Sequence, residues 1–166
     1  IEKINARAAG APLYIHLTWQ NVHAPYAPPP DWENLKSQDY LSNYCSKAAG
    51  SARPTTVTNR PFPEDLRCNF GGTLKTVDDG MKNVTLALKQ TKRWDGTLMI
   101  VASDNGGVGP GNNHPLRGSK MTPWNGGIRG SAFVTGGFIP AELRGTSNVA
   151  NMHIADWYPT LCNLVG

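Results

Sequence analysis

Two oxygen-bearing side chains, Asp104 and Asn105, directly follow an apolar run at residues 97–102. Carboxylate and amide oxygens are ligands for hard cations such as calcium. Gly106 and Gly107 come next and let the backbone turn sharply. Because Asp, Asn and Gly are also favoured turn residues, the string fits a plain strand-end turn as well. Ligands of open α/β sheets bind beyond the carboxyl ends of strands, which keeps a metal-binding interpretation open.

Two basic residues, Arg117 and Lys120, lie further along the same Gly-rich and Asn-rich stretch, residues 103–130. An arginine fork can clamp an oxyanion, and a lysine ammonium acts as a point charge. The alternative is a pair of solvated surface cations, which is the usual fate of such side chains. Trp124, in the same stretch, is interpreted as a packing anchor rather than a stacking platform.

The four histidines differ in what their neighbours suggest. His23 lies just after an apolar segment at residues 12–20, in the stretch where the predicted strand ends. An imidazole at such a place can donate to an anion or transfer a proton. A lone histidine is more often a structural hydrogen-bonding residue. His16, expected to be buried in mid-strand, and His153, before the last helix, are interpreted as structural. His114 fits either role.

Asn83-Val84-Thr85 is the only N-x-S/T tripeptide of the chain, and it is a glycosylation acceptor if the protein is secreted or lysosomal. The carboxylate pair Asp78-Asp79 lies nearby, beside Lys82. We interpret that pair as part of a solvated helical face.

The elements expected to position these residues follow from hydrophobic periodicity. Residues 72–91 have apolar side chains at helical spacing, and the run at 97–102 is typical of a strand buried on both faces of a parallel sheet. Further expected elements are a buried strand at 12–20, a short helical turn within 31–44, a surface loop at 46–67, a strand at 131–135 and a helix at 154–165. The order helix, turn, strand, polar loop predicts an α/β fold.

Bulk properties exclude several classes of protein. The chain has 166 residues, which suits one domain, and a formal charge of +4 without a run of basic residues. We therefore expect no nucleic-acid partner, whereas a small anionic substrate remains compatible. No stretch of 18 apolar residues exists, so no membrane span is expected.

Three cysteines leave at least one thiol unpaired within the chain. Cys45 and Cys68 flank a Pro-rich stretch and fit either a disulfide or two separate thiols; Cys162 stands apart. No C-x-x-C pair occurs, which disfavours a zinc site.

Four segments in order resemble the type I sulfatase family, most closely its arylsulfatase B type, which acts on sulfated glycans. They are PLYIHLTWQNVHAPYAPP, DDGMKNVTLALKQTKRWDGTLMIVASDNGG, NNHPLRGSKMTPWNGGIRG and HIADWYPTLCNLVG, and together they cover most of the chain. The resemblance implies an α/β fold that is part of an alkaline-phosphatase/sulfatase-like mixed sheet sandwiched by helices. It also implies that residues 1–166 form part of the catalytic domain of a sulfuric ester hydrolase.

The resemblance implies roles for individual residues. Asp104 and Asn105 match family ligands of calcium, and Lys120 matches a lysine that contacts the sulfate. His23 matches a histidine near the leaving group. Arg117 lies in the lysine's motif and is a candidate for substrate binding. Asn83 matches a family glycosylation site, which implies a secretory-pathway protein, lysosomal or extracellular.

The chain also departs from the family pattern. The family nucleophile is a formylglycine made from the cysteine of a C-x-P-S-R motif, and none of the three cysteines lies in such a motif. The early Asp-Asp metal pair is absent too. Calcium takes about six to eight oxygens, of which Asp104 and Asn105 supply about three. We therefore expect an upstream segment to complete the site and a C-terminal subdomain to lie outside the chain.

Two other functions compete with sulfate ester hydrolysis. The missing nucleophile fits a catalytically inactive sulfatase-like protein kept for binding or structure. A zinc-dependent phosphoryl-transfer enzyme of the same superfold is disfavoured, because zinc-ligand histidines are not arrayed in this sequence.

Overall fold

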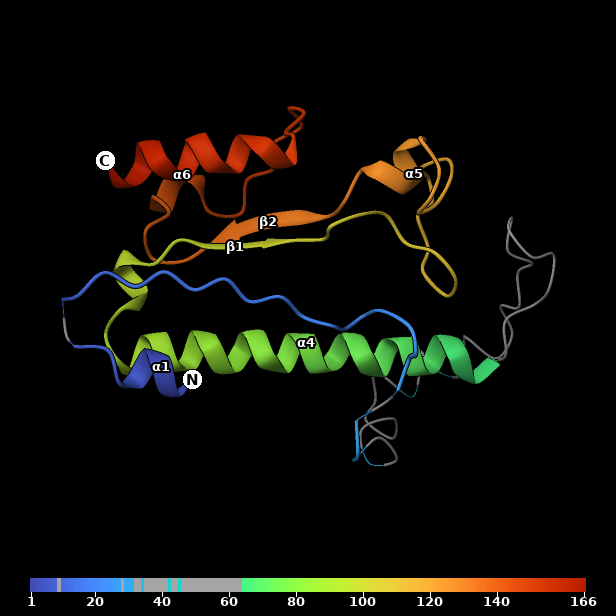
Figure 1. Cartoon of the computed structure of the whole chain (residues 1–166), viewed down its shortest axis with the longest axis horizontal. Coiled ribbons are helices and arrows are strands. Elements are labelled where there is room, and N and C mark those ends of the chain that lie inside the picture. The colour runs from blue at the N-terminus through green and yellow to red at the C-terminus, as the bar shows by residue number, and fades with distance from the viewer. Residues whose placement is uncertain (9, 28, 32–33, 35–41, 43–44, 46–63) are drawn as a thin grey trace.

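A computed structural model describes residues 1–8, 10–27, 29–31, 34, 42, 45 and 64–166. One long helix, α4 (Glu64–Gln90), runs along the molecule, and a two-stranded ribbon lies between it and the last helix (Figure 1). The ribbon strands are β1 (Met99–Ala102) and β2 (Ala132–Thr135). The shorter elements are α1 (Glu2–Asn5), η1 (Trp94–Gly96), α5 (Asn125–Ile128), η2 (Ala141–Leu143), η3 (Ile154–Asp156) and α6 (Trp157–Val165).

Helix α4 confirms the helix predicted at 72–91 and begins eight residues earlier than expected. Its buried residues include Thr73, whose hydroxyl donates to the carbonyl of Phe70 at 2.8 Å, a local bond that satisfies a polar group inside the fold. Leu74, expected on the apolar stripe, is about half exposed. Asp79 pairs with Lys75, one turn earlier, on the solvated face that the sequence predicts.

A small apolar core joins α1 to the C-terminal part of α4. Ile4 of α1 packs with Ala87 and Leu88 of α4, and these three residues are at most 6% exposed. Half-buried residues Leu13, Val84, Trp94 and Met99 surround them. Arg93 strengthens the junction, because its guanidinium donates to the carbonyls of Arg7, Ala8 and Ala11 at 2.6–3.0 Å.

The strands expected at 97–102 and 131–135 are present, but they pair antiparallel. Met99 lies opposite Thr135, and Ala102 lies opposite Ala132. The expectation of a strand buried on both faces of a parallel sheet is therefore wrong for the described residues: β1 is half-buried and β2 is mostly exposed. An apolar run predicts a strand, but the pairing direction and the burial of that strand depend on which segments lie beside it.

The buried strand predicted at 12–20 is wrong. This segment is extended, yet it pairs with no strand among the described residues and lies alongside α4 (Figure 1). Tyr14 is 81% exposed and His16 is exposed, so the expected burial of His16 is wrong as well. Trp19 rests on Gly80 of α4: a Cβ at that position would lie 2.3 Å from the Trp19 ring.

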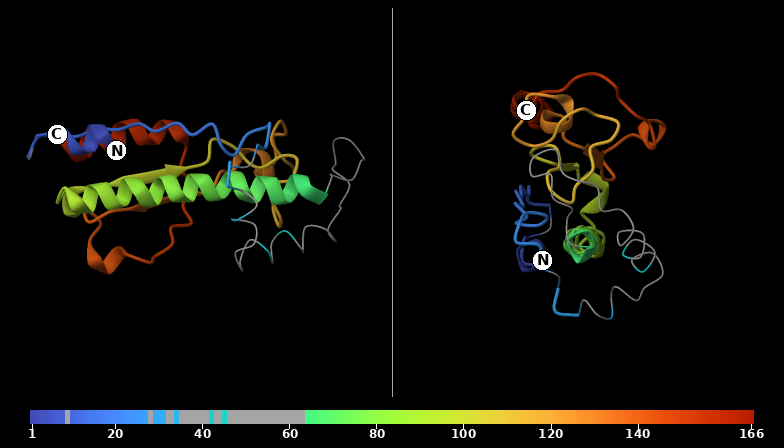
Figure 2. Two further views of the ribbon diagram at one scale, coloured as in Figure 1. Left: turned by 90° about the horizontal axis from the view of Figure 1, so that it is seen from below. Right: turned by 90° about the vertical axis from the view of Figure 1, so that its right-hand side faces the viewer.

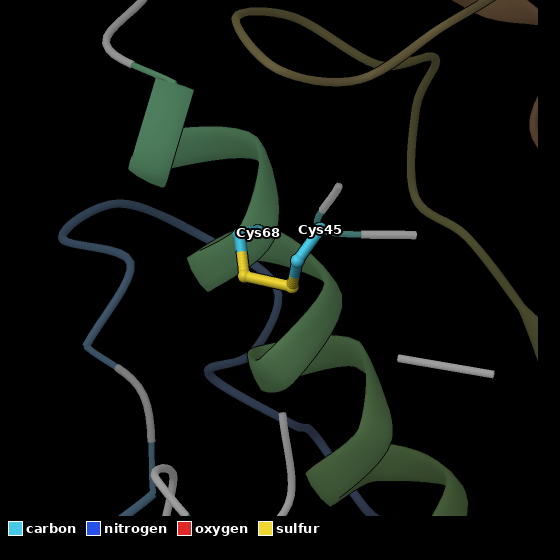
Figure 3. Close-up of a disulfide and its surroundings, with 2 residues drawn as sticks. All are labelled: Cys45 and Cys68. Atoms are coloured by element: carbon cyan, nitrogen blue, oxygen red, sulfur yellow. A yellow bond between two sulfur atoms is a disulfide. The ribbon is translucent and has the colours of Figure 1, made fainter. Parts of the chain in front are cut away.

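A disulfide joins Cys45 to Cys68, which settles the alternatives left open by the sequence (Figure 3). It holds Cys45 against the first turns of α4. Cys162 is an exposed free thiol on α6. Most of the loop expected at 46–67 and of the helical turn expected within 31–44 lies outside the described residues, and residues 64–67 are helical.

The helix expected at 154–165 is confirmed as η3 followed by α6. His153 caps this unit: its ring accepts from the amide of Ala155, and its own amide donates to the Asp156 carboxylate at 2.7 Å. The structural role predicted for His153 is thus confirmed. None of the helices in the described part of the chain is long and apolar enough to cross a membrane.

Candidate active site

Asp104 and Asn105 follow β1 directly, at its carboxyl end, as the sequence predicts. The strand end is held by the amide of Ser103, which donates to Ser131 at 2.9 Å, and by the Ser103 hydroxyl, which donates to the carbonyl of Asn105. Within the described residues, the exposed Asp104 carboxylate makes no hydrogen bond or ion pair. The turn is therefore built by its neighbours and leaves this carboxylate available.

The orientation of the Asn105 amide suits a cation ligand. Its Nδ2 donates to the carbonyl of Gly106 at 2.9 Å, which leaves Oδ1 as the atom available to a partner. An amide oxygen beside an unpaired carboxylate is a donor set that fits calcium. Among the described residues, no group of three or more His, Cys, Asp or Glu side chains could hold a metal ion. The two side chains thus fit part of a calcium shell, and other oxygens must complete it.

A close backbone crossing fixes this turn against α5. The amide of Gly106 donates to the carbonyl of Gly127 at 2.8 Å. A Cβ at residue 106 would lie 1.8 Å from the carbonyl oxygen of Gly126, a separation that atoms do not adopt. Glycine is thus required at 106 because two chain segments touch there, not only because a turn is present.

Asn113 links the turn at residues 104–107 to the segment that carries Lys120. Its Oδ1 accepts from the amide of Gly107, and its Nδ2 donates to the carbonyl of Gly107, both at 2.8 Å. The same Nδ2 donates to the carbonyl of Gly118 at 3.2 Å. Sequence reasoning did not single out Asn113, although its place in the NNHPLRGSK segment between two candidate motifs was the available signal.

Lys120 is joined to the same cluster through its backbone. Its amide donates to the carbonyl of Gly107 at 3.1 Å, two residues after Asn105. Lys120 lies inside a turn that is closed by the Thr122 hydroxyl and the backbone of Ser119. The ammonium makes no hydrogen bond or ion pair within the described residues. The fold therefore brings the two motifs together and leaves the lysine's charge unpaired.

Arg117 has a structural partner in the same loop. Its guanidinium lies over the Trp124 ring, 3.7 Å from the ring centroid, which is a stacked cation–π contact. Trp124 is about half exposed. The ring therefore packs against a loop arginine, in keeping with the anchor role predicted for it, and it holds the Arg117 side chain in place.

His23 lies in a turn bound to α4. The neighbouring Asn21 donates to the hydroxyl of Thr76 at 2.5 Å, and the His23 amide donates to Gln20 at 3.1 Å. His23 Nδ1 lies 2.9 Å from the carbonyl of Ala24. Because a carbonyl only accepts, we assign the proton to Nδ1, which leaves Nε2 for another partner.

The His23 turn and the 103–130 loop lie toward the same end of the molecule, where α4 begins (Figures 1 and 2). No recorded hydrogen bond joins them within the part of the chain that the structure describes. Tyr26, beside this turn, stacks edge-on with Phe70 of α4 at 5.6 Å, and burial raises the pKa of its hydroxyl. The structure thus brings Asp104, Asn105 and Lys120 together, with His23 at the same end but not in contact.

Asn83 is exposed on α4, as an acceptor for a glycan requires. It borders a shallow cavity of about 280 Å³ between α4 and Ile1, the residue before α1. Within the part of the chain that the structure describes, the exposed Asn83 side chain makes no hydrogen bond, so its amide is accessible.

The end of β1, the Asp104 carboxylate, the Lys120 ammonium and the Gly-rich loop thus form one cluster on a chain of mixed helices and strands. The sequence model of the sulfatase family matches residues 1–166, and the chain belongs to this family. It is 35% identical over 155 residues to arylsulfatase J of Mus musculus, covering 92% of this chain and 22% of that protein. It is 30% identical over 165 residues to a sulfatase of Formosa agariphila, covering 95% of this chain and 27% of that protein. The chain thus spans about a quarter of the length of these curated relatives.

Proposed function

We propose that residues 1–166 form part of the catalytic domain of a sulfuric ester hydrolase. The observation that carries the proposal is the hydrogen-bonded loop cluster of Asp104, Asn105 and Lys120, in which the Asp104 carboxylate, Asn105 Oδ1 and the Lys120 ammonium have no partner among the described residues. The Asp104 carboxylate is exposed and the Lys120 side chain is partly exposed, so both charges are accessible to a sulfate ester and its metal ion. Family membership and the named relatives support the same activity.

Each residue would have a separate task. Asp104 and Asn105 would hold calcium, which supplies positive charge toward the sulfate oxygens when it is bound. The Lys120 ammonium would donate to a sulfate oxygen and stabilise the charge that develops there. Arg117, held on Trp124, would border the substrate.

His23 would act on the leaving group. As an imidazolium it keeps Nδ1–H on the Ala24 carbonyl and presents Nε2–H to the ester oxygen. Breakage of the S–O bond leaves an electron pair on that oxygen, and the proton from Nε2 neutralises it. The nucleophile, a hydrated formylglycine, would come from a segment outside this chain.

The finer assignments belong to the same proposal. We infer a mixed sheet sandwiched by helices, in which β1 and β2 are joined by further strands, and a sulfated glycan as the substrate. An exposed Asn83 and the Cys45–Cys68 disulfide both suit an oxidising compartment of the secretory pathway, lysosomal or extracellular.

A second candidate is a sulfatase-like protein without activity. The observation that favours it concerns the cysteines: Cys45 and Cys68 are bonded to each other, and Cys162 lies on α6 outside any C-x-P-S-R motif. The two candidates differ in whether the complete protein carries a formylglycine.

The test uses the complete protein, produced together with a formylglycine-generating enzyme, and 4-nitrophenyl sulfate as substrate. Mass spectrometry first establishes whether the formylglycine is present. We expect calcium-dependent release of nitrophenol. Lack of hydrolysis with formylglycine present and calcium saturating would overturn the proposal and favour the inactive protein.

A further inference from the structure

A cavity of about 420 Å³ opens beside the loop cluster, and the proposed chemistry does not use it. Asn112, His114, Leu116, Arg129 and Ser131 contribute to its wall. Its volume falls within the range of small-molecule sites, about 300–1,000 Å³. Among the described residues no carboxylate borders it, and the guanidinium of Arg129 is the one formally charged group in its wall.

Arg129 differs from other arginines of the described chain. Arg93 and Arg144 donate to backbone carbonyls, and Arg117 stacks on Trp124. The Arg129 guanidinium makes no hydrogen bond, ion pair or ring contact within the described residues. Only its backbone is engaged, because its amide donates to the carbonyl of Asn125 at 2.9 Å. Its side chain is therefore not needed to hold the loop together.

The remaining polar groups of the wall can donate as well. Asn112 uses Oδ1 to accept from the His114 amide at 3.0 Å, which leaves its Nδ2 hydrogens for a ligand. The imidazole of His114 and the hydroxyl of Ser131 make no hydrogen bond to any other described residue. Leu116 adds an apolar surface. A guanidinium with several further donors and an apolar patch suits a sugar ring that carries an oxyanion.

The cavity shares a wall with the proposed active site. The backbone carbonyl of Ser131 accepts a hydrogen bond from the amide of Ser103 at 2.9 Å, and Ser103 directly precedes Asp104. A ligand group in the cavity would thus lie near the segment that carries Asp104 and Asn105, the proposed calcium ligands. Since Asn113 borders the cavity and also holds Gly107 and Gly118, one residue supports both regions.

We propose that this cavity, the Arg129 cavity, is a substrate subsite for a second anionic group of the sugar, distinct from the sulfate ester that is cleaved. The inference rests on the proposed hydrolase function and narrows it to substrates with at least two negative charges. A uronate carboxylate and a second sulfate share the chemistry that Arg129 would recognise, and the experiment below separates them.

The kinetic test compares three substrates in the complete protein: 4-nitrophenyl sulfate, a disulfated disaccharide and a monosulfated disaccharide with a uronate. Arg129→Gln should lower kcat/KM for at least one disaccharide, relative to that for the aryl sulfate, by tenfold or more. The loss should appear in KM. The disaccharide that suffers the loss identifies the anion as sulfate or carboxylate.

Two further variants define the controls. Lys82→Gln removes the same charge from an exposed residue of α4 and should leave the substrate ratio within twofold. Arg129→Lys keeps the charge but not the fork and should lose part of the effect. Equal losses on all three substrates, or no loss on any, would overturn the subsite.

A binding measurement separates failure of the subsite from failure of the proposed function. If the wild-type protein hydrolyses none of the substrates, calorimetric titration with glucuronate, a 6-sulfated monosaccharide and glucose still tests the cavity. The wild type should bind one charged sugar at least tenfold more tightly than glucose, and Arg129→Gln should abolish that preference. Absence of any preference in the wild type would reject the subsite.

Discussion

At the scale of single residues, the Lys120 ammonium has no partner among the described residues, which suits the sulfate contact proposed for it. Its backbone is fixed by Gly107, and its side chain contributes no recorded bond to the fold. We predict that Lys120→Ala lowers kcat/KM for an aryl sulfate by about 10²–10³-fold, the usual effect of removing an oxyanion donor. The melting temperature should change little, as measured by thermal unfolding.

Lys82→Ala is the matched control for Lys120, because it removes an exposed lysine from a solvated helical face. It should leave both activity and melting temperature at wild-type values. If Lys120→Ala also lowered the melting temperature substantially, its loss of activity could be explained by unfolding, and this would contradict the functional role.

Asn113 shows the opposite pattern, with every side-chain donor and acceptor turned inward. Asn113→Asp replaces the Nδ2 donor by an oxygen that faces the carbonyls of Gly107 and Gly118. We expect a loss of about 2–3 kcal/mol in unfolding free energy, because two acceptors lose their donor and meet a charge instead. Urea denaturation of the complete protein measures it.

The same substitution at the adjacent residue provides the control. Asn112 uses only its Oδ1, toward the amide of His114, and aspartate keeps that acceptor. Asn112→Asp should therefore be close to neutral in stability. Equal destabilisation by the two variants would show that the loop tolerates no negative charge, whatever its bonds.

At the scale of elements, the Cys45–Cys68 disulfide attaches a preceding segment to the start of α4 (Figure 3). With a separation of 23 residues, the loop-entropy model gives about 3 kcal/mol of stabilisation. We predict that the double variant Cys45→Ser, Cys68→Ser unfolds at lower denaturant concentration. Cys162→Ser, which removes an exposed thiol, should leave the midpoint unchanged, and a reducing agent should affect only proteins with the bridge.

The closest backbone approach in the site is the crossing between the turn at residues 104–107 and α5. Gly106→Ala would force the two backbones apart, and we expect it to cost about 3 kcal/mol, the upper range for overpacking. Gly96→Ala is the control, since a Cβ there meets nothing within 4 Å. Comparable unfolding free energies for the two variants would contradict the crossing.

Element identity was predictable where the signal is local. The apolar spacing in α4 and the Asp156-containing start of the last helix both indicated helices, and both are present. The early start of α4 was missed because Gly71 and Gly72 imitate a break, although Pro63 before Glu64 is a common sign of a helix start. The strand at 12–20 was wrong because a strand needs a partner, and sequence periodicity cannot supply one.

Site identity divides in the same way. The place of Asp104 and Asn105 directly after a strand could be predicted, because the apolar run at 97–102 marks the strand, whereas their role as metal ligands stays a prediction. Asn113 and Arg129 could not, because their roles depend on bonds and cavities formed by chain folding. The Asn113 side chain makes three hydrogen bonds to the backbone, whereas the Arg129 side chain makes none within the described residues. Residue type alone does not predict this difference.

At the scale of the whole molecule, the described core is small for the apolar surface that surrounds it. Ile4, Ala87 and Leu88 are buried together, whereas Tyr158 and Val165 of α6 are about four-fifths exposed. Among the described elements, α6 contacts only η3. These surfaces suit the proposal that β1, β2 and α6 belong to a larger sandwich of sheet and helices.

Metal binding connects the site to the stability of the whole protein. A ligand that binds only the folded state stabilises it by about 2.7 kcal/mol at a hundredfold excess over its dissociation constant. We therefore predict that calcium raises the melting temperature of the complete protein above its value in chelator. Asp104→Asn should remove most of that rise, because it deletes the unpaired carboxylate beside Asn105 while keeping its size.

Asp78→Asn separates this metal effect from a general effect of charge. It removes a carboxylate of the same formal charge from the exposed face of α4, so the calcium-dependent rise should persist in full. A rise of equal size in Asp104→Asn and wild type would place the calcium elsewhere. In that case the unpaired groups at the end of β1 would need another ligand, and the sulfate-binding role of Lys120 would have to stand without the metal.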